Sequence, residues 1–222
     1  ATVSWTVRAP TGRTVVANGS LVDTRTTGRG RRARTVTRWR ESRPIAPYLM
    51  VIGAGPLVKI DLGATACGLA DLRRCVRQSV YVAPELRKTM PGSFARAGDI
   101  VRFFASRVGP FPYEKLAHLQ SATRFGGMEN ATAIFYADAM FRRGGVGEGI
   151  IAHETAHQWF GDAVTEREWP HLWLSEGFAT YFAALWTQHA HGDSAFRQNM
   201  AEIRSAILSD ARSVPSHPVI DT

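Results

Sequence analysis

The sequence predicts an α+β fold in which a β-rich region, residues 1–87, precedes a region of strands and helices, residues 88–222. Two observations support this prediction. In the first region, short runs of β-branched and aromatic residues alternate with Gly, Pro and Asn, which is typical of strands joined by turns. After about residue 93 the apolar residues recur at helical spacing. We therefore expect two domains, with a boundary near residues 84–93.

The composition is that of a folded protein with a sizeable core. Of the 222 residues, 45% are hydrophobic and 21% are charged, which excludes an intrinsically disordered chain. No apolar run approaches the ~20 residues that a membrane-spanning helix needs. We therefore expect no membrane span in this segment.

Six runs in the first region are expected to be strands, and one of them belongs to an arginine-rich hairpin. The expected strands are residues 2–7, 13–18, 34–39, 48–53, 57–62 and 77–82. Eight arginines fall between Arg25 and Arg43, and the formal net charge is +8. Arginines alternate with Thr and Trp around Arg38 after a "TGRG" turn signal, which favours a hairpin with one solvated arginine face. A nucleic-acid surface is the disfavoured alternative, so we expect no nucleic-acid partner.

The second region changes from strands to helices along its length. We expect a helix over residues 94–108, because Ile100, Val101, Phe104 and Val108 follow a helical period. Strands are expected on either side of "RFGGMEN", residues 124–130. Three further helices are expected over residues 149–160, 172–189 and 194–209.

The two cysteines, Cys67 and Cys75, leave two interpretations open. A disulfide is geometrically possible in an oxidising compartment, and two unpaired thiols are the alternative. No histidines stand near them, so they do not predict a zinc site. The possible disulfide favours a bacterial-type envelope or secreted location over a cytoplasmic one.

A metal site is predicted by "HETAH", residues 153–157. His153 and His157 lie four residues apart, so both imidazoles project from one face of a helix and reach one ion. Glu154 lies beside a ligand and can take a proton from metal-bound water. Glu176 follows in "HLWLSEGFATYF", where a helix beginning near Pro170 can fold back and supply a third ligand.

Structural roles were weighed for the same residues. His153 and His157 could be hydrogen-bonded core histidines, and Glu176 could serve a helix N-terminus. A buried cluster of ionisable groups is costly unless the groups are paired or bound to metal, which favours the metal site. The other histidines are interpreted as surface or structural residues: His118, His171, His189, His191 and His217.

These motifs resemble the aminopeptidase N family of zinc metallopeptidases, the gluzincin aminopeptidases, which include leukotriene hydrolase. The resemblance rests on H-E-x-x-H, a glutamate after 18 intervening residues, and "GGMEN" upstream, which is similar to the family's G-x-M-E-N exopeptidase motif. It is dense from about residue 87 to 182. The resemblance implies the later part of an N-terminal β-domain followed by a thermolysin-like catalytic domain.

The resemblance also implies a role for each motif residue. His153, His157 and Glu176 would bind one Zn2+, and Glu154 would be the general base of a zinc-dependent aminopeptidase that attacks peptides with metal-activated water. Glu129 would bind the free amine of a peptide substrate. The remaining substrate-binding residues would be Phe125, Gly126, Gly127 and Met128, with Phe125 and Met128 bordering the pocket for the first side chain.

The family has two features that this chain is expected to lack. Its oxyanion-stabilising tyrosine would lie beyond Thr222, and a second part of its amine anchor would precede Ala1. We therefore expect a fragment truncated at both ends that binds zinc and has little or no peptidase activity, since losing one oxyanion donor typically costs ~10²–10³ in turnover.

Two other functions stay open at this stage. An epoxide hydrolase of the leukotriene-hydrolase type would share the same motifs, and a non-catalytic module could retain the metal. Cobalt or manganese could also occupy these ligands. The preferred first residue of the substrate and the oligomeric state do not follow from the sequence.

Overall fold

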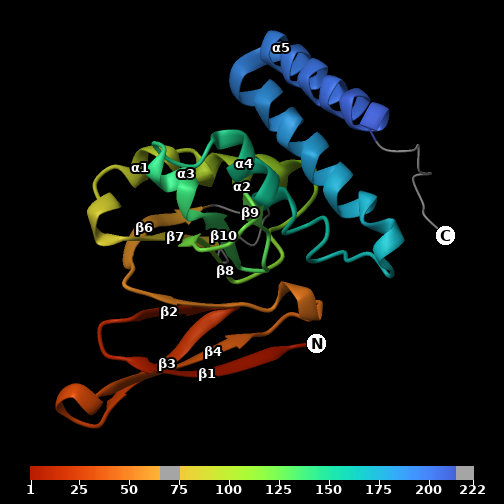
Figure 1. The fold of residues 1–222 in the computed structure, drawn as a ribbon. Coiled ribbons are helices and arrows are strands. Elements are labelled where there is room, and N and C mark those ends of the chain that lie inside the picture. Colours follow the sequence, from red (N-terminus) through yellow and green to blue (C-terminus); the bar gives the residue numbers. More distant parts are fainter. Residues whose placement is uncertain (66–75, 214–222) are drawn as a thin grey trace.

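The computed structural model describes residues 1–65 and 76–213 and has the α+β architecture that the sequence predicts (Figure 1). Cys67 and Cys75, with the disulfide considered for them, lie outside the described residues. None of the described helices combines the length and the apolar character needed to cross a membrane.

Antiparallel strands make up the N-terminal part of the chain. A three-stranded sheet has the order β1-β4-β3, and a separate pair joins β2 to β5. The strands are β1 (Val3–Pro10), β2 (Thr14–Ala17), β3 (Ser20–Thr27), β4 (Arg34–Glu41) and β5 (Ile52–Gly55). Strands β3 and β4 form the expected arginine-rich hairpin, in which Trp39 is buried while Arg38 and Arg40 are exposed. Short 3-10 turns follow β3 and precede β5, at η1 (Gly30–Arg32) and η2 (Pro47–Leu49).

A five-stranded mixed sheet forms the centre of the molecule. Its order is β6-β7-β8-β10-β9, with β7, β8 and β10 parallel and both edge strands antiparallel. The strands are β6 (Val58–Thr65), β7 (Val76–Val82), β8 (Lys115–Ser121), β9 (Gly127–Met128) and β10 (Ala133–Ala137). The short strand β9 is therefore an edge of this sheet.

The predicted domain boundary at residue 87 would divide the strands of this sheet between the two expected domains. Strands β6 and β7 precede that residue, yet β7 pairs directly with β8, for example Val80 with His118. Alternating apolar residues predict a strand but do not specify which sheet the strand joins. The division into residues 1–87 and 88–222 stays a prediction.

Helices cover one face of the central sheet and extend beyond it. They are α1 (Met90–Ser93), α2 (Ala97–Arg107), α3 (Asp138–Arg142), α4 (Glu148–Ala156) and α5 (Trp173–Ser213), with 3-10 turns η3 (Pro84–Leu86) and η4 (Trp169–His171). Helix α2 ends one residue before Val108, which is 38% exposed and does not join the core. Figure 1 shows α5 as two arms, because Gly192 has non-helical dihedral angles. The two helices expected over residues 172–209 are these two arms.

The two faces of the central sheet contact two different cores. Toward the helices, Ile134 and Tyr136 of β10 pack in a large cluster with Ile151 of α4. Toward the N-terminal strands, Leu119 of β8 packs in a second cluster that includes Val16 and Trp39. The sheet is thus buried on both faces, and it holds α4 on one side and the N-terminal strands on the other.

Candidate metal centre and substrate cleft

Three side chains from α4, its C-terminal end and α5 converge in a geometry suited to a metal ion. The Nε2 atoms of His153 and His157 lie 3.0 Å apart, and Glu176 Oε2 lies 3.4 Å from the first and 3.6 Å from the second. Tetrahedral zinc bonds of about 2.0–2.1 Å place ligand atoms about 3.3 Å from each other. Within the part of the chain that the structure describes, no other group of three His, Cys, Asp or Glu ligand atoms lies so close together. The donor set and its spacing therefore fit zinc.

Helix α4 orients the two histidines because its opposite face is anchored in the core. Ile151, Ala152 and Ala156 are almost fully buried against the sheet and α2. His153 and His157, one helical turn apart, therefore point together toward α5. The helix ends at Ala156, earlier than expected, and His157 caps it while keeping an αR conformation.

Hydrogen bonds fix the orientation of the His157 ring. Its Nδ1 atom lies 3.0 Å from the carbonyl oxygen of Phe160 and 3.0 Å from Ser175 Oγ. A carbonyl oxygen only accepts hydrogen bonds, so Nδ1 carries the proton and Nε2 presents a lone pair to the metal position. Gly161 allows this contact, since a Cβ there would lie 2.2 Å from Ser175 Oγ.

The electrostatic balance among the three ligands depends on their mutual contacts. The adjacent imidazoles of His153 and His157 lower the pKa of Glu176 well below its usual value. Burial acts to lower the pKa of His157, but Glu176 and the other nearby carboxylates raise it above its usual value overall. The cluster thus combines a carboxylate with two imidazoles that it attracts.

Glu154 lies on the sheet side of the same helix, against strand β9. Its side chain is buried, and burial is the main cause that raises its pKa to about 8, opposed by His157. A Cβ built on Gly127 would lie 1.9 Å from Glu154 Oε1, so the carboxylate occupies the space that a side chain would fill. The structure therefore brings the "GGMEN" and "HETAH" segments into direct contact.

The remaining residues of "FGGMEN" have different environments. Phe125 is 67% exposed, and Met128 pairs with Phe135 of β10. Glu129 is 9% exposed, and its carboxylate contributes to raising the pKa of both Glu154 and Asp162. Glu129 and Glu154, 25 residues apart in the sequence, are therefore coupled electrostatically.

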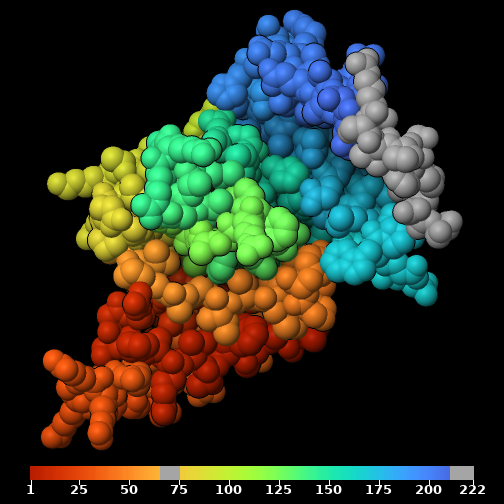
Figure 2. Space-filling view, viewed as in Figure 1, coloured from red at the N-terminus to blue at the C-terminus, as the bar shows by residue number. Residues whose placement is uncertain are grey.

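A cleft of about 350 Å³ lies between residues 126–127, α4 and α5. Figure 2 shows the surface hollowed where the green and teal segments meet the blue helix α5. Gly126, Gly127, His153 and Glu154 line it together with residues that the sequence analysis did not single out, namely Gly149, Ile150, Thr180, Ala183, Thr187, Asn199 and Ile203. The last two come from the second arm of α5, and no motif marks them because they reach the cleft only through the bend at Gly192.

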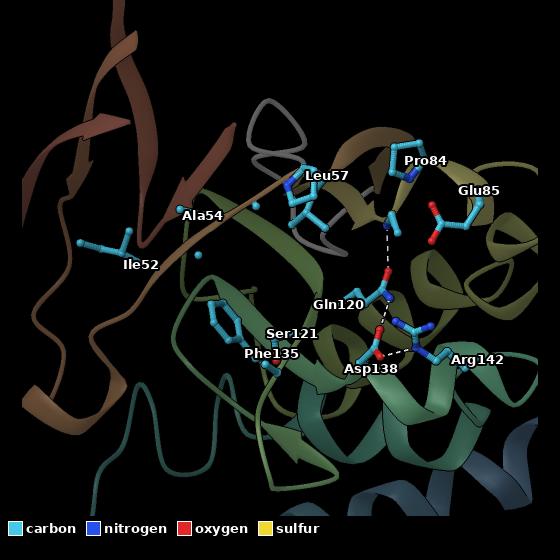
Figure 3. Close-up of a pocket in the computed structure, with 15 residues that line it drawn as sticks. Ile52, Ala54, Leu57, Pro84, Glu85, Gln120, Ser121, Phe135, Asp138 and Arg142 are labelled. Atoms are coloured by element: carbon cyan, nitrogen blue, oxygen red, sulfur yellow. Dashed lines mark hydrogen bonds and ion pairs between the residues drawn. The ribbon is translucent and has the colours of Figure 1, made fainter. Parts of the chain in front are cut away.

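A larger cavity of about 550 Å³ lies elsewhere, between β5 and the ends of β8 and β10 (Figure 3). Three of its polar side chains are already paired: Asp138 accepts from Gln120 and forms an ion pair with Arg142. The oxygen of Gln120 accepts from the Ala83 amide at 2.8 Å. None of the predicted site residues lines this cavity.

Comparison with known proteins agrees with the predicted fold and family. The model of the "Peptidase family M1 domain" matches residues 96–222. Leucine aminopeptidase 2 of Eremothecium gossypii is 31% identical over 175 residues, which are 74% of this chain and 26% of that protein. Aminopeptidase B of Rattus norvegicus is 28% identical over 215 residues, covering 90% of this chain and 30% of that protein.

Solved structures share the whole fold of the chain. A two-domain M1 zinc metallopeptidase bound to L-arginine superposes with a TM-score of 0.78 at 26% identity, covering 100% of this chain and 47% of that one. The M1 zinc metallopeptidase from Deinococcus radiodurans gives a TM-score of 0.77 at 24% identity over the same shares.

The fold and the site define a class of proteins in which an H-E-x-x-H helix is followed by a helix that carries a glutamate. The chain belongs to peptidase family M1. It spans about a quarter of the length of leucine aminopeptidase 2.

Proposed function

We propose that this chain carries the active site of a zinc-dependent aminopeptidase, which removes N-terminal residues from peptides. The main support is one observation: His153 of the His153–His157–Glu176 cluster lines a single cleft together with Glu154 and Gly127. The names of the relatives, which are aminopeptidases and zinc metallopeptidases, support the same proposal.

His153, His157 and Glu176 would hold the zinc ion. When bound, zinc supplies Lewis acidity that polarises a carbonyl group and lowers the pKa of water. Glu154 lines the same cleft as His153 and would accept a proton from the attacking water and deliver it to the leaving amine. Its burial against Gly127 holds the carboxylate in place for both transfers.

Glu129 would bind the free amine of the peptide substrate. A carboxylate pairs with a cationic terminus through charge-assisted hydrogen bonds, and the place of Glu129 directly after β9 would limit cleavage to the first residue. Gly126 and Gly127 would bind the substrate backbone at edge strand β9. The exposed Phe125 and the half-buried Met128 would border the pocket for the first side chain.

The experiment that tests this function compares wild-type protein with Glu154→Gln. Metal analysis is expected to give one zinc per chain for both proteins, while any hydrolysis of an aminoacyl chromogenic substrate disappears in the variant. Loss of zinc from Glu154→Gln would contradict the assignment of Glu154 as a base that does not bind the metal.

Two other functions are distinguished by the same samples. Hydrolysis of a fatty epoxide without hydrolysis of aminoacyl substrates would favour an epoxide hydrolase. Zinc binding with neither activity, in a protein that also fails to bind an aminoacyl hydroxamate, would favour a metal-retaining module without catalysis.

A further inference from the structure

Thr132 has a backbone conformation that its residue type disfavours. Its φ is 65°, and it is the one non-glycine residue with positive φ among those the structure describes. A β-branched side chain in this region is strained, typically by about 1–3 kcal/mol, and such strain persists only where the surroundings impose it. Thr132 is fully buried and lies three residues after Glu129.

Three parts of the molecule hold Thr132. Its amide donates to Gln158 Oε1 at 2.9 Å, and its hydroxyl accepts from the Gly19 amide at 2.7 Å. Its carbonyl oxygen accepts from Lys115 Nζ at 3.0 Å and from the Ala117 amide at 2.9 Å. Every polar group of Thr132 is therefore paired. Its partners lie just after α4, between β2 and β3, and on β8.

Gln158 connects both ends of the segment that begins at Glu129. While its Oε1 accepts from Thr132, its Nε2 donates to the Glu129 carbonyl oxygen at 2.9 Å and to Asp162 Oδ2 at 2.8 Å. Gln158 is fully buried and directly follows the metal ligand His157. The backbone of Glu129 is thus hydrogen-bonded to the segment that holds the metal cluster.

The N-terminal strands brace the same segment from the other side. Asn18 is fully buried; its Nδ2 donates to the Ala131 carbonyl oxygen at 2.7 Å and to the Leu49 carbonyl oxygen at 2.9 Å. The Asn18 side-chain oxygen accepts from the Val51 amide at 2.7 Å. Residues 129–132 are therefore held between the two parts of the molecule.

We propose that Gln158 and Thr132 are positioning residues that set the place of Glu129 relative to the metal cluster, so that Glu129 recognises the amine one residue from the cleaved bond. The inference rests on the proposed role of Glu129 in amine binding. Neither residue needs to touch substrate, since each acts on the backbone of residues 129–132. A small displacement of Glu129 would weaken its recognition of the amine, which explains why a strained conformation would be kept at Thr132.

The test measures how much the amine contributes to binding. The probes are L-leucine hydroxamate and 4-methylpentanoic hydroxamate, which differ only by the amine. Their dissociation constants are measured by calorimetry on the full zinc-loaded chain, and the ratio of the two constants reports amine recognition. For wild type we expect a ratio of at least about tenfold, the size of one hydrogen bond to a charged group.

Four variants separate positioning from a general structural role. Thr132→Val removes the hydroxyl with almost no change of shape, and Gln158→Met removes all three hydrogen bonds of the Gln158 side chain. Both are expected to lower the ratio about tenfold or to abolish it, with unchanged zinc content and unchanged affinity for the probe that lacks the amine. Thr132→Ser keeps the hydroxyl and should keep most of the ratio. Thr37→Val is the matched control, because the Thr37 hydroxyl is also buried but has no partner.

The outcomes distinguish this inference from the proposed function. If Glu129→Gln lowers the ratio but Thr132→Val and Gln158→Met leave it unchanged, the positioning inference is wrong and the role of Glu129 stands. If the wild-type ratio is near one, the role of Glu129 is wrong, and the inference fails with it. If the variants lose affinity for both probes equally, the two residues have a merely structural role, and the inference is overturned.

A metal-free measurement gives an independent readout. Amide hydrogen exchange of Thr132 is expected to be slow in wild-type protein and faster in Gln158→Met, which lacks the acceptor for that amide. Equal exchange rates in the two proteins would contradict the proposed contact.

Discussion

At the scale of single residues, the candidate site depends on two glycines, because another side chain occupies the space that their own side chain would fill. Gly127 leaves room for the Glu154 carboxylate, and Gly161 leaves room for Ser175 Oγ beside His157. Only Gly161 also has a positive φ, 109°, so Gly127 is required for space alone. The two glycines thus bring the metal-binding segment close to β9 and to α5.

Gly127→Ala is expected to displace the Glu154 carboxylate without unfolding the protein. The new Cβ would lie 1.9 Å from Oε1 and 2.7 Å from Cγ of Glu154, so the flexible side chain must move away. Zinc content and thermal stability should change little, while turnover of an aminoacyl substrate falls by about 10²-fold, as expected for a misplaced general base. Gly92→Ala in α1, where a Cβ meets nothing, is the matched control. Unchanged turnover in Gly127→Ala would show that Glu154 does not act from this position.

The sequence predicts residue roles best where the chemistry depends on local spacing. His153 and His157 follow from an i, i+4 pair, and the geometry of their Nε2 atoms agrees with that prediction. The strain at Thr132 and the fit of Glu154 against Gly127 depend on contacts between distant segments, which spacing does not encode. Gln158 is next to a predicted ligand, but only its hydrogen bonds to Thr132 and Glu129 suggest the positioning role proposed for it.

At the scale of elements, the metal cluster joins α4 to the first arm of α5. Ser175 lies one residue before Glu176, and its hydroxyl contacts both His157 Nδ1 and the Phe160 carbonyl oxygen. The turn after α4 and the start of α5 therefore support the same histidine. The second arm of α5 then returns over the cleft through the bend at Gly192.

Ser175→Ala is expected to weaken zinc binding by about tenfold, since groups that orient a ligating histidine typically contribute 10–100-fold to metal affinity. The Phe160 carbonyl oxygen remains as a partner of His157, so binding should not be lost. Competition with a chromophoric chelator measures the effect. Ser106→Ala is the control, because that hydroxyl bonds Phe103 within α2. Equal affinities for wild type and Ser175→Ala would show that Phe160 alone orients the ring.

Gly192→Ala is expected to lower the free energy of unfolding by about 1–3 kcal/mol, because φ of 86° with ψ of 176° is a region that only glycine occupies without strain. Gly177→Ala, in the first arm of the same helix and with open space around the new Cβ, should instead raise stability by up to about 1 kcal/mol. Urea unfolding of the metal-free proteins measures both changes. Changes of the same sign would contradict the assignment of Gly192 as the required bend.

At the scale of the whole molecule, buried polar groups join the N-terminal strands to the central sheet. Lys115 of β8 is partly buried and donates to the Ala17 and Thr132 carbonyl oxygens at 2.9 and 3.0 Å. Its ammonium also lies over the ring of Trp39. The sequence predicts the strands on both sides of this junction, but a lysine in a strand is expected at the surface. Only the assembled fold places Lys115 inside.

This junction predicts a specific dependence of stability on pH. Burial lowers the pKa of Lys115 from 10.5 to about 7, although Glu41 and Glu114 raise it and Lys59 adds to the lowering. The unfolded chain therefore binds more protons than the folded chain between pH 7 and about 10, so the Lys115 contribution makes stability rise with pH there. Glu41 acts at lower pH, since burial raises its pKa to about 7 and its contribution makes stability fall as pH rises from about 4.5 to 7.

Lys115→Met is expected to flatten the rise between pH 7 and 9.5 while leaving the fall below pH 7 largely in place. The free energy of unfolding is measured by urea titration of metal-free protein at half-unit steps, staying below the range in which buried tyrosines such as Tyr81 ionise. Lys59→Met on β6 is the control, because Lys59 carries the same charge but its side chain is exposed. If wild type and Lys115→Met have the same slope above pH 7, Lys115 stays fully charged in the folded protein, and its three hydrogen bonds outweigh the cost of burying the ammonium.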